Sequence, residues 1–278
     1  MDKLFWKTLQ ENKYAIPAGH TPTSLTAELF TYLSSTDPEL RDEIAYETFA
    51  NFLELDYFSL EEIEIYIANL LANLDVGIEQ GESDSVFLRS FSVLFLAKIV
   101  HNDNKAPLLK EPLIQTILER GLWYLAAEQD LRGYVKGKGW AHALAHTADL
   151  LLMLGKSLNI GENEHRMILN EIRAKLTRST NWVFLYGEDD RLSRAVLEIL
   201  RRDTLPTAFV RDWLDSFLRP SGYSWHGAWT KEKSAQAFFN VRNFLRSLYL
   251  QVASDAKLPL QGELAAMILE TVQNLKPY

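Results

Sequence analysis

The chain has no cysteine, and this absence removes several kinds of chemistry at once. Among its 278 residues there is no thiol for a disulfide, for nucleophilic catalysis or for a thiolate metal site. Any metal would have to be held by histidine and carboxylate side chains. A sequence without disulfide-forming residues is typical of a reducing compartment, so we expect a cytoplasmic location.

Long apolar runs and an excess of positive charge are also missing. No segment approaches the roughly 20 consecutive apolar residues that a membrane span requires, and the N-terminus has no apolar run of signal-peptide length. The 29 lysines and arginines are outnumbered by 37 aspartates and glutamates, a formal net charge of −8 that repels nucleic acid. We therefore expect no membrane span and no nucleic-acid partner.

The sequence also lacks a linker. No stretch rich in proline, glycine or serine divides it, and 47% of its residues are hydrophobic, which is enough to bury a substantial core. We expect residues 1–278 to form a single domain.

What the sequence does have is a succession of amphipathic segments with the helical period, arranged in pairs. The first of each pair begins near Pro38, Asp84, Gly139, Asp190 and Ser234. These intervals are irregular, from 44 to 55 residues, and lie near the ~40–47 residues of HEAT and armadillo repeats. The pattern predicts an all-α protein, a HEAT/armadillo-like α-solenoid of about five helix pairs. A compact helical bundle, which obeys the same packing rules, is the alternative.

Two helix starts carry recognisable capping signals. Asp37 precedes Pro38, which suits the first position of a helix because its missing N–H costs nothing there. Ser59 and Glu62 have the spacing of a capping box. We expect helices to begin at both places.

Two histidines and an aspartate share one stripe of the segment expected to be helical over residues 139–154. On a helix, His142, His146 and Asp149 fall within roughly 60° of one another, and Lys138 joins them if the helix starts early. Two imidazoles and a carboxylate could hold a divalent metal. Packing against the next repeat is the simpler interpretation, since no further ligand is evident, and we predict no bound metal and no cofactor.

Arg89 is the only charged residue between Asp84 and Lys98, in a segment that is apolar nearly all round. Such a helix is buried, and an unpaired guanidinium in a core costs several kcal/mol. We predict that Arg89 is buried and paired with an acidic residue of a neighbouring helix. The acidic residues 188–190 are candidate partners.

Isolated charges recur on the other first-of-pair helices. Arg242, Arg246 and Tyr249 form a further stripe. The stripes are either a ladder of salt bridges between repeats or the lining of a groove that binds a polar ligand through its arginines. The aromatic segment around Tyr223, Trp225, His226 and Trp229 is either a recognition loop or a hydrophobic plug over the last repeat.

Several stretches together resemble the bacterial domain-of-unknown-function family 2785, a helical, HEAT-like family. They are "DEIAYETFANFL", "SVFLRSFSVLFLAKIVHNDN", "DLRGYVKGKGWAHALAHTADLL", "YGEDDRLS" and "FLRSLYL". The resemblance implies a helical repeat fold and no particular activity. Its signature includes Arg89, Arg132, Trp140, His142, His146, Asp149, Asp189 and Arg191.

We therefore expect a binding or scaffold protein whose charged groove takes a polar small molecule, peptide or protein. The expected site residues are Arg89, Arg132, Lys138, Trp140, His142, His146, Asp149, Glu188, Asp189, Arg191, Arg242 and Arg246. Lys138 and the His/Asp stripe are expected to face one cavity with residues 188–191. The alternative is a hydrolase or transferase that uses His142, His146 and Asp149 as metal ligands or as acid/base groups.

Overall fold

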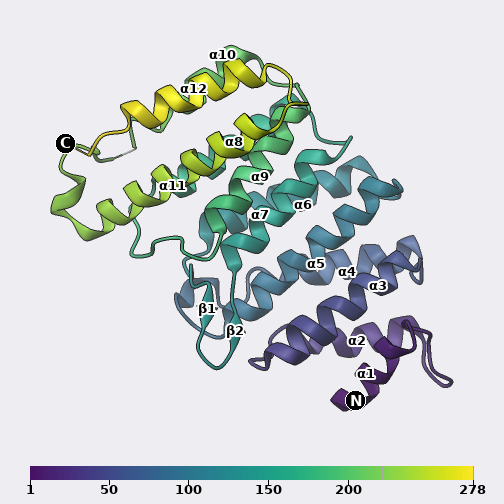
Figure 1. Ribbon diagram of the computed structural model, residues 1–278. Helices are drawn as coiled ribbons and strands as arrows, with labels where there is room; N and C mark the ends of the chain where they lie inside the picture. The colour runs from purple at the N-terminus through teal and green to yellow at the C-terminus, as the bar shows by residue number, and fades with distance from the viewer. Residues whose placement is uncertain (221, 278) are drawn as a thin grey trace. The chain divides into compact units, whose positions relative to one another are not determined.

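The computed structural model describes residues 1–220 and 222–277, and in this part of the chain nearly all regular structure is helical (Figure 1). Twelve α-helices and one two-stranded hairpin are present among the described residues, which confirms the all-α class. The chain divides into two compact units, residues 1–150 and 151–278. Whether the helices form a solenoid or a bundle stays a prediction.

The first unit contains the elements that carry most of the predicted site. They are α1 (Lys3–Glu11), α2 (Pro22–Tyr32), a π-helical stretch (Glu39–Tyr46) that runs into α3 (Glu47–Glu54), α4 (Leu60–Asn73), α5 (Ser85–Lys105), α6 (Glu111–Ala127), β1 (Tyr134–Val135) and β2 (Gly139–Trp140). Helices α3 and α4 both pack on α5. Helix α7 (Ala143–Lys156) begins in this unit and continues into the next.

The second unit is built on α11, which packs against α9 and α12. Its elements are α8 (Glu162–Thr177), α9 (Glu188–Arg201), α10 (Thr207–Ser216), α11 (Glu232–Ser254) and α12 (Gln261–Asn274). Among the residues that the structure describes, no helix combines the length and the apolarity needed to cross a membrane.

The helical periodicity located the helices from α3 onward, and the capping signals hold. Ser59 Oγ accepts a hydrogen bond from the amide of Glu62 at 3.3 Å, and the Glu62 carboxylate accepts one from the amide of Ser59 at 2.8 Å. The helix expected at Pro38 begins at Glu39, whose amide donates to Asp37 Oδ1 at 3.0 Å. Helices α1 and α2 were not predicted.

The helix expected to start at Gly139 starts instead at Ala143, so that prediction is wrong by one turn. Gly139 and Trp140 belong to β2, and both Gly139 (φ 79°) and His142 (φ 50°) have left-handed backbone conformations. A right-handed helix cannot pass through such residues. Lys138 therefore lies in the hairpin turn and not on the helical stripe, and Trp140 lies on a strand and not on a helix.

The core of the first unit is rich in aromatic side chains. Phe49 of α3 stacks on Phe95 of α5 with ring centroids 4.7 Å apart, and both rings are fully buried. Phe30, Phe58 and Tyr66 contact this pair at centroid distances of 5.6 to 6.0 Å. Large rings in contact supply much of the apolar area that a unit of this size must bury.

Candidate functional site

The hairpin formed by β1 and β2 is the centre of the predicted site. Tyr134 pairs with Trp140 and Val135 with Gly139, so residues 136–138 make the turn. At Gly139 a Cβ atom would lie 2.7 Å from Cβ of Pro38, and the residue's φ of 79° disfavours any side chain. Glycine at this position is thus required both by the backbone and by the close approach of the π-helical stretch.

Arg41 fastens this hairpin to the preceding helices. Its side chain is fully buried, and Nη2 donates hydrogen bonds to the carbonyl oxygens of Lys138 at 2.9 Å and Trp140 at 3.3 Å. Nη1 donates to the carbonyl oxygen of Ser35 at 2.6 Å. One guanidinium therefore links two parts of the chain nearly 100 residues apart.

Aromatic rings complete the environment of Arg41. The guanidinium carbon lies 4.2 Å from the ring centroid of Phe87 and 4.7 Å from that of Phe91, both on α5. Cation–π contact partly offsets the cost of burying the charge. Sequence analysis missed Arg41, although it precedes the buried Ala45 by one helical turn and so lies on the inward face.

Arg89 is fully buried and paired, as predicted. Its Nε and Nη2 donate to the two carboxylate oxygens of Glu128 at 2.7 and 2.9 Å, and Tyr124 Oη donates to the same carboxylate at 2.8 Å. Its Nη1 donates to the carbonyl oxygen of Val76 and to Ser85 Oγ. This two-bonded geometry is the strongest arrangement available to an arginine and a carboxylate.

The partner of Arg89 is Glu128, the residue that ends α6, and not one of residues 188–190. The candidates were wrong because they were chosen from an acidic cluster, whereas the bond depends on how α5 and α6 meet. The finding favours the salt-bridge interpretation for this arginine, since its donors are taken up inside the first unit.

A second ion pair anchors the loop between α6 and β1. Asp130 is fully buried and accepts hydrogen bonds from Nε and Nη2 of Arg132 at 2.8 and 2.6 Å. Arg132 Nη2 also donates to the carbonyl oxygen of Ser83, and Lys138 pairs with Asp84 at 2.6 Å. The loop and the hairpin are therefore both tied to the start of α5.

The two histidines of the predicted stripe are brought close together, but they are engaged by their surroundings. The ring of His142 stacks on Trp140 with centroids 4.3 Å apart, and it lies 5.7 Å from the ring of His146. His146 Nδ1 is 3.2 Å from the carbonyl oxygen of Ser90. Within residues 1–220 and 222–277, no three His, Asp or Glu side chains are grouped to hold a metal.

The remaining predicted site residues belong to the second unit. Glu188 is buried at the start of α9, where burial raises the pKa of its carboxyl group, and it accepts a hydrogen bond from the amide of Tyr186 at 2.8 Å. Burial also raises the pKa of Asp189. Arg191 lies on the same first turn of α9. The shared cavity of these residues with His142 stays a prediction.

On α11, Arg242 and Arg246 have different surroundings. Arg242 lies over the ring of Phe239 at 4.6 Å, and desolvation, together with the charge of Arg246, lowers its pKa. Arg246 is exposed. The predicted stripe thus contains one arginine stacked on a ring and one in solvent.

The aromatic segment of the second unit is largely anchored. Trp225 is buried and its Nε1 donates to the carbonyl oxygen of Phe217 at 2.7 Å, while Tyr223 Oη donates to that of Thr177 at 2.7 Å. A hydrophobic plug would have such contacts. Trp229 is 46% exposed.

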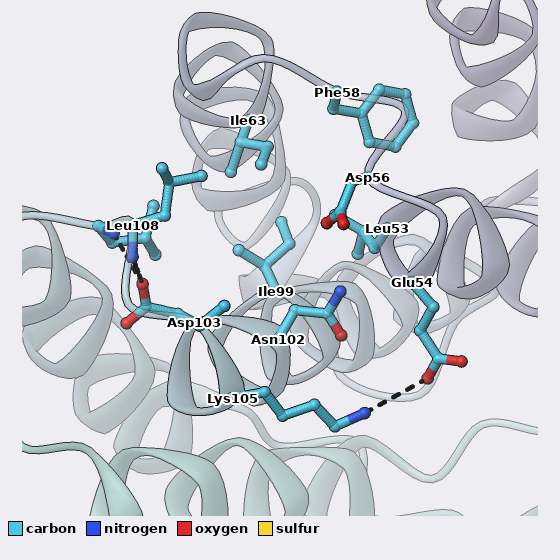
Figure 2. A pocket seen from close by; sticks show the side chains of 12 residues that line it. Leu53, Glu54, Asp56, Phe58, Ile63, Ile99, Asn102, Asp103, Lys105 and Leu108 are labelled. Atoms are coloured by element: carbon cyan, nitrogen blue, oxygen red, sulfur yellow. Dashed lines mark hydrogen bonds and ion pairs between the residues drawn. The ribbon is translucent and has the colours of Figure 1, made fainter.

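A pocket that sequence analysis did not find lies in the first unit, bordered by α3, α4 and α5 (Figure 2). Its volume is about 320 Å³, and its apolar wall includes Leu53, Phe58, Ile63 and Ile99. These four residues are apolar, and the sequence gives no sign that separates them from residues of a filled core. Only the way the helices meet leaves space between them.

Asp42 makes the stability of the region around Arg41 depend on pH. Its carboxylate accepts a hydrogen bond from Arg41 Nη2 at 3.1 Å, yet desolvation dominates and raises the pKa of Asp42 to about 6. Because the native state binds this proton more tightly than the unfolded chain, the stability contributed by Asp42 falls as the pH rises from about 4 to 6.

We expect Asp42→Asn, which cannot titrate, to gain stability relative to the unsubstituted protein over that interval. The gain should be about 1–2 kcal/mol, less than the full shift would give, because the side chain is 33% exposed. Urea denaturation of both proteins at pH values below 4 and above 7 measures it. If the free energies of unfolding of the two proteins changed with pH in the same way, the raised pKa of Asp42 would be contradicted.

Taken together, the fold and the hairpin define an all-α protein in which the buried Arg41 and the half-buried Arg132 hold a short, partly exposed hairpin in place. The chain belongs to the family described as "Protein of unknown function (DUF2785)", whose model matches residues 74–250. The match begins at the end of α4 and includes the hairpin and most of α11. No curated protein and no solved structure matches the chain.

Proposed function

We propose that the chain is a binding protein and that the hairpin is the surface that contacts a partner. The observation that carries the proposal is the exposure of two large aromatic side chains on an anchored backbone: Tyr134 is 49% and Trp140 39% exposed. Their rings meet edge to face at 5.0 Å. Tyrosine and tryptophan are the residues that most often dominate the energy of protein interfaces.

Rigidity makes these rings better suited to binding. Arg41, the Arg132–Asp130 pair and the Lys138–Asp84 pair restrain the hairpin before any partner arrives. Less conformational entropy is then lost on association, so more of the contact energy remains as affinity. In this proposal Arg41 and Arg132 support the site and the exposed rings make the contacts.

The charge of the hairpin indicates the kind of partner. Lys136 is exposed in the turn that joins the two strands carrying these rings. A partner with carboxylates and an apolar or aromatic group complements this surface, which favours an acidic peptide segment. We prefer a binding function over a hydrolase or transferase activity. His142 stacks on Trp140 and His146 lies against the Ser90 carbonyl oxygen, and these contacts position the hairpin.

NMR of the full chain with ¹⁵N-labelled tryptophan tests the proposal, with peptides of alternating glutamate and phenylalanine as the probe. We expect saturable shifts of the Trp140 indole signal and at least a roughly tenfold loss of affinity in Tyr134→Ala. Trp229→Ala, which removes an exposed tryptophan of the second unit, should bind normally. A Trp140 signal that stays unchanged at millimolar peptide would refute the proposal.

A further inference from the structure

We propose that the pocket bordered by α3, α4 and α5 is a second binding site, which takes a small organic amine: an apolar body carrying one protonated nitrogen. The site is separate from the hairpin surface, since none of its lining residues belongs to β1 or β2. It therefore does not depend on the function proposed above.

The size and the walls of the pocket suit a small apolar group. Its volume of about 320 Å³ lies at the lower end of the range of about 300–1,000 Å³ that is usual for ligand pockets. Leu53, Phe58 and Ile63 approach it from α3, the following turn and α4, and Ile99 approaches it from α5. A ligand of this kind would cover apolar surface that the fold itself leaves in a hollow.

The polar atoms of this hollow include hydrogen-bond acceptors, beside the amide nitrogen of Asn102 and the ammonium group of Lys105. Asn102 Oδ1 is buried and accepts no hydrogen bond from the described residues. A buried acceptor without a donor is costly, so a ligand N–H group placed there would be favoured. Figure 2 shows the side chains of Asn102 and Asp56 directed into the same space from α5 and from the turn after α3, with the amide nitrogen of Asn102 drawn on the side of Asp56.

The other carboxylates of the pocket already have partners within the protein. Glu54 contacts Lys98 and lies 3.7 Å from Lys105. Asp103 accepts hydrogen bonds from the amides of Leu108 and Leu109, both at 2.7 Å.

Asp56 is an exposed residue, and it differs from both because in the described part of the chain its carboxylate makes neither an ion pair nor a hydrogen bond. Lys105 also lines the pocket, but its ammonium group lies beside Glu54, so the charge left for a ligand is negative. An ammonium group complements it, whereas a carboxylate ligand would be repelled.

The backbone at Asp56 gives a way to separate a ligand-binding role from a structural one. Asp56 follows α3 in the left-handed conformation (φ 54°), with its amide bonded to the carbonyl oxygen of Leu53 and the amide of Tyr57 bonded to that of Phe52. This is the helix-ending motif in which glycine and asparagine are preferred. Asp56→Asn therefore removes the charge and keeps a residue suited to the conformation.

Calorimetric titration of the full chain with 2-phenylethylamine, 2-phenylethanol and phenylacetate tests the site. The three probes share a phenyl ring and differ in charge. We expect the amine to bind at least about tenfold more tightly than the alcohol, and phenylacetate to bind weakest. Asn102→Leu should also weaken the binding of the amine, because it removes the buried acceptor Asn102 Oδ1.

Asp56→Asn should lower the affinity for the amine at least about tenfold and leave the melting temperature unchanged. Asp203→Asn is the matched control, since Asp203 also follows a helix in the left-handed conformation (φ 49°) and does not line this pocket. It should bind as the unsubstituted protein does. Phenylacetate binding more tightly than the amine, no binding of the amine at millimolar concentration, or Asp56→Asn binding it normally would each overturn the proposal.

Discussion

Replacing Arg89 with methionine should lower the free energy of unfolding by about 3–5 kcal/mol. The substitution fills much of the same volume, so the loss arises from charge and not from a cavity. Glu128 would remain buried without the guanidinium that neutralises it, although the Tyr124 hydroxyl and the Asp130 amide would still donate to its carboxylate. Urea denaturation followed by circular dichroism measures the change.

Two further variants test whether the loss of stability comes from the buried ion pair: a substitution in a surface pair and a double substitution. Arg120 bonds Asp75 at 2.7 Å on the surface, and Arg120→Met should cost less than about 1 kcal/mol because solvent screens such a pair. Combining Arg89→Met with Glu128→Leu should recover part of the lost stability, since no buried charge is then stranded. If Arg89→Met cost no more than Arg120→Met, the buried pair would not have the importance assigned to it.

Arg41→Met should cost about 3 kcal/mol and should free the hairpin. The substitution leaves the carbonyl oxygens of Ser35, Lys138 and Trp140 without their donor, and each buried unsatisfied group costs about 1–3 kcal/mol. Part of that cost is avoided if the hairpin moves out into water. Hydrogen exchange of the hairpin amides should therefore accelerate more than that of α9 in the second unit.

Arg41→Lys separates the charge from the geometry. An ammonium group has no planar fork and cannot reach carbonyls on both sides as the guanidinium does. We expect an intermediate loss of stability and the same faster exchange in the hairpin. Unchanged exchange in both variants would show that Arg41 does not hold the hairpin, and affinity for the acidic peptides should fall wherever exchange accelerates.

The family, the burial of Arg89 and the burial of Arg41 could be predicted from the sequence to different extents. The long stretch "DLRGYVKGKGWAHALAHTADLL" was enough to indicate the family that the comparison confirms. Arg89 was predicted to be buried because its apolar neighbours are adjacent in sequence. Arg41 was not, since its own segment carries several other charges, which hide the apolar pattern that marked Arg89.

The spacing of residues along the sequence determined the all-α class, the helices from α3 to α12, the capping box at Ser59 and the burial of Arg89. Each of these depends on residues within one or two helical turns, where spacing alone decides which side chains share a face. Tertiary structure decided the partner of Arg89, the hairpin that displaced the start of α7, and the pocket near Asp56. Those features join residues about 40 to 100 positions apart, and such pairings are selected by the packing of whole helices, which periodicity does not encode.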